Sequence, residues 1–496
     1  MEAETDRQAG VLLHVTSLPS ARGSGRLGRD ARRFVDWLAE AGFSVWQVLP
    51  LTPTHDDLSP YLGFSSFAGN PNLIDAPSLQ QDSALRESWL GQGLREADGI
   101  DGPGLVRRLQ GLVKEHEPES LPGGTAFQHD NRGWLPDYAC FMTLRHDQGG
   151  RAWLEWDAPL RDRNEAAVAA VVEREVDLYR AYLLEQYLFE RQWRALKSYA
   201  NRSGVSIFGD APLYVAHDSA DVWANRQFFA LDDEGRPTQV AGTPPDMFSE
   251  TGQIWGNPVY DWEALARDGF RWWISRIERQ LGLYDLLRID HFRGLQAYWS
   301  IPAGEETAVG GEWVEAPGDS LLQALRDRLG RLPLVAEDLG YITAEVDRLR
   351  ERFGLPSMRV LQFAFDGSED NPHLPRNTPV NAVAYTGTHD NDTVVGWYAS
   401  LHPEAQAYVR ATLGIGSRDT VLETMIDGVL ESPAQLAMLP MQDILGLGSE
   451  GRMNTPATIE GNWRWQFRWR QLEDAVATDY RRRLRHAGRV ISNRNR

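Results

Sequence analysis

Eight short apolar runs, most of them separated by amphipathic helical stretches, constrain the fold of this chain more than any other feature. Strands that alternate with helices predict parallel pairing, and eight such units close into a (β/α)₈ TIM barrel. After Asp30, which is placed to cap a helix, apolar residues recur at helical spacing from Phe34 to Ala41. The predicted strands are residues 11–15, 44–51, 205–208, 286–289, 334–336, 360–365, 382–385 and 436–439.

The spacing of these runs is uneven, which predicts insertions into one catalytic domain that spans residues 1–496. About 150 residues separate the second run from the third, far more than one crossover helix needs. We expect a largely helical insertion over 75–200, with a long helical pattern from 166 to 200. A second excursion, 214–262, follows the third strand and is expected to form a loop subdomain over the active site.

Charge and composition exclude several classes of protein. The formal net charge of −19 argues against binding to nucleic acid, which needs clustered Lys and Arg. Cys140 is the one cysteine, so no intrachain disulfide is expected, and the spacing of His and Cys predicts no metal site. No apolar run approaches the ~18 residues of a membrane span, and the acidic amino terminus is unlike a signal peptide. These features predict a soluble cytoplasmic protein with no membrane partner.

Carboxylates follow several predicted strands, where a barrel enzyme keeps its catalytic groups. Asp290 and Glu337 come directly after a strand, and Asp390 follows another at a short distance. Two carboxylates with a third nearby suit glycosyl transfer, in which one attacks the sugar and another protonates the leaving oxygen. Arg288 lies two residues before Asp290, so both face the barrel interior, and its charge favours an ionised nucleophile. The alternative role of such carboxylates is helix capping, which we expect for Asp338.

Aromatic residues are frequent in polar segments rich in Gly and Pro, notably 246–262 and 461–469. A large core accounts for most of the 18 Trp, 15 Tyr and 17 Phe. In these two segments, rings beside hydrogen-bonding side chains also fit a sugar-binding groove. Both readings stay open. Two GxGxxG patterns, at 23–28 and 446–451, lack the strand and acidic-residue context of a dinucleotide site, so no cofactor is expected.

Along nearly its whole length the chain resembles the amylomaltase family of 4-α-glucanotransferases in the α-amylase clan. Any one matching segment would be weak evidence, but their common order makes the resemblance specific. The segments are HVTSLP at 14–19, SSFAGNP at 65–71, VAHDSADVWAN at 215–225, PPD at 244–246 with FSETGQ at 248–253, RIDHFRG at 288–294, AEDLG at 336–340, YTGTHDNDT at 385–393, and GLGSE at 446–450 through RMNTP at 452–456.

The resemblance implies transfer between α-1,4-glucans and maltooligosaccharides with retention, through a covalent glycosyl-enzyme and without a cofactor or metal. It implies disproportionation and leaves cyclisation open. Carried over by position, Asp290 is the nucleophile, Glu337 the general acid/base, and Asp390 the third carboxylate, which grips sugar hydroxyls. For Asp210, a site role is weighed against a purely structural hydrogen bond. The expected substrate-binding residues are Arg288, His389, Asp210, Tyr61, Met247, Phe248, Ser249, Trp255, His291 and Asn454.

The chain departs from the family at two places. Met247 stands where many relatives carry tyrosine after PPD, and the loop 55–61 differs from its usual pattern. Both changes spare the carboxylates, so they bear on acceptor preference rather than on the reaction. No amylase-type C-terminal β-sandwich is expected, because the sequence after 439 is short, helix-like and rich in Arg. Two alternatives remain: a retaining α-1,4-glucan hydrolase and a non-catalytic glucan-binding protein. The sequence leaves the oligomeric state unknown.

Overall fold

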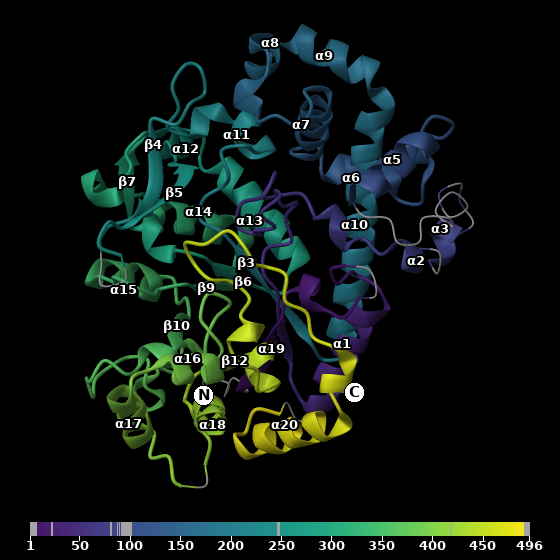
Figure 1. The fold of residues 1–496 in the computed structure, drawn as a ribbon. Coiled ribbons are helices and arrows are strands. Elements are labelled where there is room, and N and C mark those ends of the chain that lie inside the picture. Colours follow the sequence, from purple (N-terminus) through teal and green to yellow (C-terminus); the bar gives the residue numbers. More distant parts are fainter. Residues whose placement is uncertain are drawn as a thin grey trace.

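An eight-stranded parallel sheet forms the centre of the computed structural model, which describes residues 7–490 apart from 21–22, 80–81, 87, 89, 91–101, 246–248 and 418 (Figure 1). The strand order is β10-β11-β12-β1-β2-β3-β6-β9. The two outermost strands meet where the amide of Ala336 donates to the carbonyl of Pro356 at 3.0 Å, so the sheet curls into a (β/α)₈ TIM barrel. The strands are β1 (Gln8–Leu12), β2 (Val45–Gln47), β3 (Ser206–Ala211), β6 (Leu286–Ile289), β9 (Leu334–Ala336), β10 (Ser357–Val360), β11 (Ala382–Tyr385) and β12 (Leu436–Pro440).

The predicted strands fall at these positions, but the first and the sixth are shifted. β1 begins at Gln8 instead of 11, and β10 ends at Val360, where the prediction began its strand. In both cases a partly buried 3-10 turn continues the apolar run, over Val15–Ser17 and Leu361–Phe363. Because apolar residues of these turns are buried like those of the strands, the apolar pattern does not mark where each strand ends.

Helices surround the barrel, and the first shows that Asp30 was wrongly expected to be a cap. α1 begins at Arg29, and Gly28 occupies its N-cap position. The carboxylate of Asp30 lies in the first turn and accepts a hydrogen bond from the indole of Trp469. The other helices outside the insertion and the excursion are α13 (Arg271–Leu283), α14 (Gly318–Leu329), α15 (Ala344–Arg352), α16 (Val394–Ser400), α17 (Pro403–Thr412), α18 (Val421–Glu431), α19 (Met441–Ile444) and α20 (Asp474–His486).

Helices also make up the described part of the segment between β2 and β3, which stands at the upper right of Figure 1. The long helix α10 (Val176–Arg202) runs back from it to the barrel, and Trp193 in α10 donates to the carbonyl of Leu283 at 2.9 Å. α10 therefore joins this segment to α13. The other helices here are α2 (Ala76–Leu79), α3 (Ser83–Arg86), α5 (Gly102–Leu112), α6 (Gly124–Asp130), α7 (Leu135–Asp147), α8 (Ala158–Arg161) and α9 (Glu165–Arg174).

A second sheet lies at the upper left of Figure 1. It is antiparallel, with the order β5-β4-β7-β8. The excursion after β3 contributes α11 (Ala220–Ala224), α12 (Trp262–Arg267), β4 (Gln239–Thr243) and β5 (Gln253–Pro258), and the segment after β6 contributes β7 (Ala297–Pro302) and β8 (Glu312–Glu315). The excursion thus carries two regular strands as well as loops.

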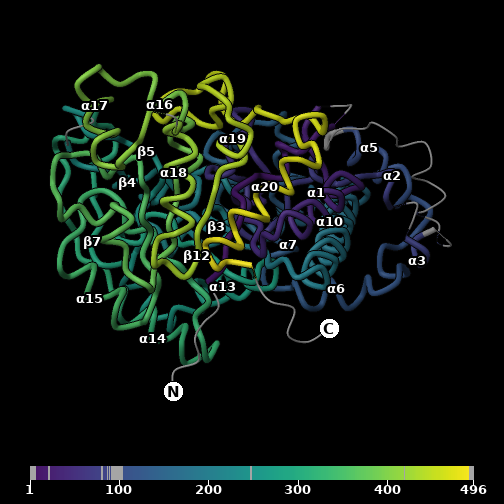
Figure 2. The backbone as a smooth tube through the Cα atoms, turned by 90° about the horizontal axis from the view of Figure 1, so that it is seen from below, coloured from purple at the N-terminus to yellow at the C-terminus, as the bar shows by residue number. Residues whose placement is uncertain are grey.

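The first and last parts of the barrel are tied together. β1 pairs on one side with β2 and on the other with β12, and Figure 2 shows α1 and α20 side by side. Arg489 is fully buried, and its guanidinium donates to the carbonyls of Gln8, Ser432 and Ala434 at 2.7–2.9 Å. None of the helices in the described residues is long and apolar enough to span a membrane.

Candidate active site

The carboxyl ends of β3, β6 and β9 bring three carboxylates to one place. Asp210 lies opposite Arg288 in the pairing of β3 with β6, and Ile289 lies opposite Ala336 in the pairing of β6 with β9. The backbone continues this pattern past the strands, since the amide of Glu337 donates to Ile289 at 3.1 Å. Register therefore positions Asp290 and Glu337 before any side chain interacts.

Arg288 connects two of these carboxylates. Its buried guanidinium donates to both oxygens of Asp210, at 2.9 and 2.8 Å, and Nη2 lies 2.7 Å from Oδ1 of Asp290. The hydroxyl of Tyr61 donates to Asp210 at 2.7 Å. Burial alone would lower the pKa of Arg288, but the charges of Asp210 and Asp290 outweigh it and raise that pKa well above its ordinary value. A permanent cation thus lies directly against the side chain of Asp290.

Glu337 has the opposite environment. Burial is the main cause that raises its pKa to about 8, and the negative charge of Asp290 adds to this, against the opposing effect of Arg288. Its Oε2 accepts the amide of His291 at 2.7 Å, and Oε1 accepts the amide of Leu339 at 3.2 Å. His291 adopts a left-handed conformation, with φ of 50°, which turns its amide back towards Glu337. At neutral pH, Glu337 is therefore mainly a carboxylic acid.

Asp390 is the most exposed of the three predicted catalytic carboxylates, with 47% of its side chain accessible. Asn454 donates to its Oδ1 at 2.7 Å, and Arg452 donates to its backbone carbonyl at 2.8 Å. His389 lies beside it, with Nε2 at 3.4 Å from Oδ2. Asn454 therefore holds one carboxylate oxygen, while the other lies beside His389 on a side chain that is nearly half exposed.

Aromatic rings connect these groups into one site. Tyr61 stacks on His389, with ring centres 5.1 Å apart and planes 16° apart. The ring of Trp463 lies 5.9 Å from both. On the side of Glu337, the indole of Trp255 meets His291 edge-on at 4.8 Å. Rings beside carboxylates are the lining that a sugar, with its apolar faces and hydroxyl edges, requires.

Two residues of the site, Trp463 and His14, were not predicted from the sequence. Trp463 lies in a segment where the sequence indicated rings but not which one, and its left-handed backbone, with φ of 63°, directs it towards Tyr61. His14 lies two residues beyond the end of β1 and is buried near His389; burial, with the charge of His389 as a smaller cause, lowers its pKa to about 3. The sequence prediction placed it inside a strand, at 11–15, so its position at the strand end was not recognised.

A buried aspartate behind the site was not expected either. Asp443 in α19 accepts the hydroxyl of Thr386 at 2.6 Å and the amide of Val394 at 2.8 Å. These two residues begin and end the loop that carries His389 and Asp390. Asp443 therefore fixes both ends of that loop.

The expectation for Asp338 was wrong. The carboxylate does not cap α15, since Thr343 occupies that N-cap position. It is instead buried, accepts the amide of Met358 at 2.7 Å, and pairs with Arg350 and Arg359 at 3.3 Å each. Asp338 therefore has a structural role: its buried carboxylate links the end of β9 to α15 and β10.

The remaining predicted residues are placed as follows. Ser249 donates to the carbonyl of Gly252 at 2.8 Å, within its own turn. Met247 and Phe248 lie outside the described residues. Within the ranges that the structure covers, no group of three or more His, Cys, Asp or Glu side chains could hold a metal ion.

Two carboxyl groups together at the carboxyl end of a barrel, one against a buried arginine and the other with a raised pKa, are typical of enzymes that break glycosidic bonds. Comparison with known proteins gives the family. A family model described as 4-alpha-glucanotransferase matches residues 13–472. A 4-alpha-glucanotransferase of Thermus thermophilus is 47% identical over 496 residues, covering 97% of this chain and 98% of that protein. The chloroplastic/amyloplastic 4-alpha-glucanotransferase of Solanum tuberosum is 43% identical over 474 residues, covering 93% and 82%.

Comparison with solved structures supports the same family. The amylomaltase from Streptococcus agalactiae in complex with acarbose superimposes with a TM-score of 0.89 at 36% identity, covering 98% of this chain and all of that one. The amylomaltase from Corynebacterium glutamicum, at 19% identity, shares the fold with a TM-score of 0.74, covering 97% and 75%. The chain belongs to the 4-alpha-glucanotransferase (amylomaltase) family and is an enzyme of glucan transfer.

Proposed function

We propose that this enzyme disproportionates maltooligosaccharides and longer α-1,4-glucans with retention, using Asp290, Glu337 and Asp390. The observation that carries the proposal is the contrast between two neighbouring carboxyl groups. Arg288 lies against Asp290 at 2.7 Å, whereas burial raises the pKa of Glu337 to about 8. Pairs whose environments separate their protonation states suit the roles of nucleophile and acid.

In the first step, Asp290 attacks the anomeric carbon of the donor glucan and forms a glycosyl ester. Glu337 gives its proton to the 4-oxygen of the departing sugar as the glycosidic bond breaks. In the second step, Glu337 takes the proton from the 4-hydroxyl of an acceptor glucan, which attacks the same carbon and releases Asp290. Two displacements at one carbon retain its configuration.

Asp390 and Asp210 have supporting roles in this proposal. Asp390, held by Asn454, keeps one carboxylate oxygen for the hydroxyls of the sugar that reacts. Asp210 is bound by Arg288 and Tyr61 and is almost wholly buried, so it orients Arg288 from behind. We therefore place Asp210 as a positioning residue and Asp390 as a residue that contacts substrate.

Incubation with maltotriose tests transfer directly. We expect free glucose together with a ladder of longer glucans, while the total number of reducing ends stays nearly constant, because each cleavage is followed by a new bond to a sugar. Chromatography of the products with a parallel reducing-end assay measures both. If reducing ends rose in step with the loss of maltotriose, a retaining hydrolase would explain the site instead.

The dependence of kcat/KM on pH tests the role of Glu337. The acid form starts the reaction, and it is the main form below the pKa of about 8. We therefore expect kcat/KM to fall about tenfold for each pH unit well above 8, with unfolding monitored in parallel to exclude loss of protein. A profile that stayed flat to pH 10 would contradict proton donation by Glu337.

A further inference from the structure

Arg293 is a buried arginine that the proposed mechanism does not use. It is the second residue of the 3-10 helix Phe292–Leu295, which begins directly after His291, and it is 5% exposed. Its Cζ is 3.6 Å from the ring centre of Trp313 and 5.8 Å from that of Tyr341. Its Nη1 donates to the carbonyl of Tyr341 at 2.6 Å. The arginine thus holds two aromatic residues from separate segments.

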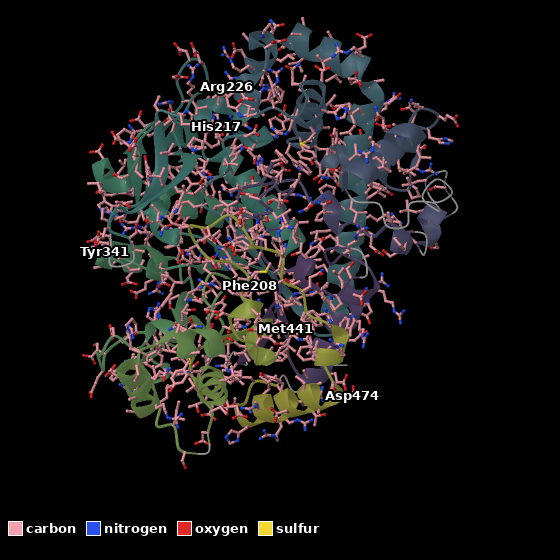
Figure 3. All side chains as sticks on the ribbon, viewed as in Figure 1. Phe208, His217, Arg226, Tyr341, Met441 and Asp474 are labelled. Carbon is pink, nitrogen blue, oxygen red and sulfur yellow. The ribbon has the colours of Figure 1, made fainter. Side chains whose placement is uncertain are left out.

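These two rings face solvent. Tyr341 is 71% exposed and Trp313 is 38% exposed, and Tyr341 lies at the left margin of the molecule in Figure 3. Trp313 is held from behind by the indole of Trp299, at 5.2 Å and edge-on. Single exposed rings are common, but two that are fixed by one buried cation form a firm platform rather than loose surface side chains. A rigid ring face loses little conformational entropy when a ligand stacks on it.

The platform is carried by the same two chain segments as part of the candidate active site. Tyr341 lies in the loop after β9, four residues beyond Glu337, and Arg293 lies two residues beyond His291. The two segments are also joined by a bond from the amide of Phe292 to the carbonyl of Glu337, at 3.1 Å. The segments that carry Arg293 and Tyr341 are therefore the ones that continue from His291 and Glu337, and they are hydrogen-bonded to each other.

A polar cavity of about 430 Å³ lies near the platform, lined by residues of α14 and α15 together with Leu295, Gln296 and the end of β8. Glu315 is two residues from Trp313 on β8, so the two side chains share one face of the strand. Asp319 pairs with Arg352 at 2.7 Å, and Glu345 pairs with Arg348 at 2.5 Å, which leaves most of the charge compensated. Such a lining suits a neutral ligand with many hydroxyls better than an anion. The polar residues that line the cavity are Gln296, Glu315, Asp319, Glu345, Arg348 and Arg352.

We propose that Trp313, Tyr341 and the adjoining cavity form a second binding surface for the α-1,4-glucan chain, outside the carboxylate site. Sugar rings would stack on the two aromatic faces, and their hydroxyls would bind the polar lining. The proposal rests on the proposed function, since it assigns a second contact to the same substrate. Its consequence is a preference for long glucans: maltotriose fills the carboxylate site alone, whereas amylose also engages the platform.

The test compares two substrates in the full-length enzyme. We expect Tyr341→Ala to raise KM for amylose about 5-fold while kcat/KM for maltotriose changes less than 2-fold. Trp313→Ala should act in the same direction. Tyr341→Phe, which keeps the ring, should restore the wild-type KM for amylose. Tyr408→Ala is the matched control, because Tyr408 is 37% exposed and lies away from the platform, on α17.

Direct binding separates this proposal from the proposed function. In the Glu337→Gln background, calorimetry with amylose and with maltotriose measures affinity without turnover, and Tyr341→Ala should weaken binding of amylose alone. Equal losses for both glucans would show that Tyr341 only supports the loop of Glu337, and unchanged affinity for amylose would show that no glucan binds there. Either result overturns the second surface. The turnover of maltotriose by the wild-type enzyme reports on the proposed function independently.

Discussion

Replacing Glu337 with glutamine, or Asp290 with asparagine, is expected to lower the turnover of maltotriose at least ~10³-fold with little change in fold. Both substitutions preserve shape, but one removes the proton donor and the other the nucleophile. Initial rates with maltotriose, together with circular dichroism, measure the two effects. Glu185→Gln is a matched control, because Glu185 is also buried and its pKa is raised by burial to about 7, yet it bonds to Tyr138 and Gln186 in the helical insertion.

A glycosyl fluoride separates the two roles. Fluoride departs with little help from an acid, so Glu337→Gln should still release fluoride in a first turnover. Asp290→Asn should not, because no carboxylate remains to attack. Turnover of maltotriose by either variant close to that of Glu185→Gln, or fluoride release by Asp290→Asn, would show that the assignment of the site is wrong.

Replacing Arg288 with leucine is expected to reduce both stability and activity. Asp210 would be left buried without its cation, and breaking such a pair costs about 3–5 kcal/mol in the free energy of unfolding. Turnover should fall at least ~10²-fold, because Asp290 loses the group that orients it, and small displacements of a reacting atom cost that much. Urea unfolding and initial rates measure the two losses.

Arg279→Leu separates stability from catalysis. Arg279 forms an ion pair with Glu190 at 2.7 Å, with both side chains less than a tenth exposed, and it lies between α13 and α10, away from the carboxylates. This variant should lose stability but retain turnover per folded molecule. If Arg288→Leu kept its turnover as well, Arg288 would have only a structural role.

Much of the fold was predictable, because the alternation of strands and helices is a local and repetitive pattern. Each parallel strand is buried on both faces and reads as a short apolar run. The errors arose where burial continued past a strand, as at Leu361, which belongs to a turn. Asp30 was wrongly predicted to cap α1 for a different reason: its side chain binds Trp469, which is far away in the sequence.

The residues of the site also differ in whether their place depends on local sequence or on distant contacts. Asp290 and Glu337 follow directly from strand ends, whereas the partners of Asp338 and Asp443 depend on contacts across the barrel. No local pattern distinguishes a carboxylate that caps a helix from one that binds a distant arginine. Trp463 shows the same limit, since its position depends on a left-handed backbone.

The position of β1 between β2 and β12 has a consequence for how the enzyme is made. Gln8 pairs with Leu436, so one edge of the first strand has no partner until almost the whole chain has left the ribosome. At about 5–20 residues per second, that delay is roughly 20–90 s. During this time an apolar strand edge is free to pair with other chains. Arg489 is synthesised later still, after the last barrel strand. Its hydrogen bonds to Gln8 and Ser432 then connect β1 to the segment before β12.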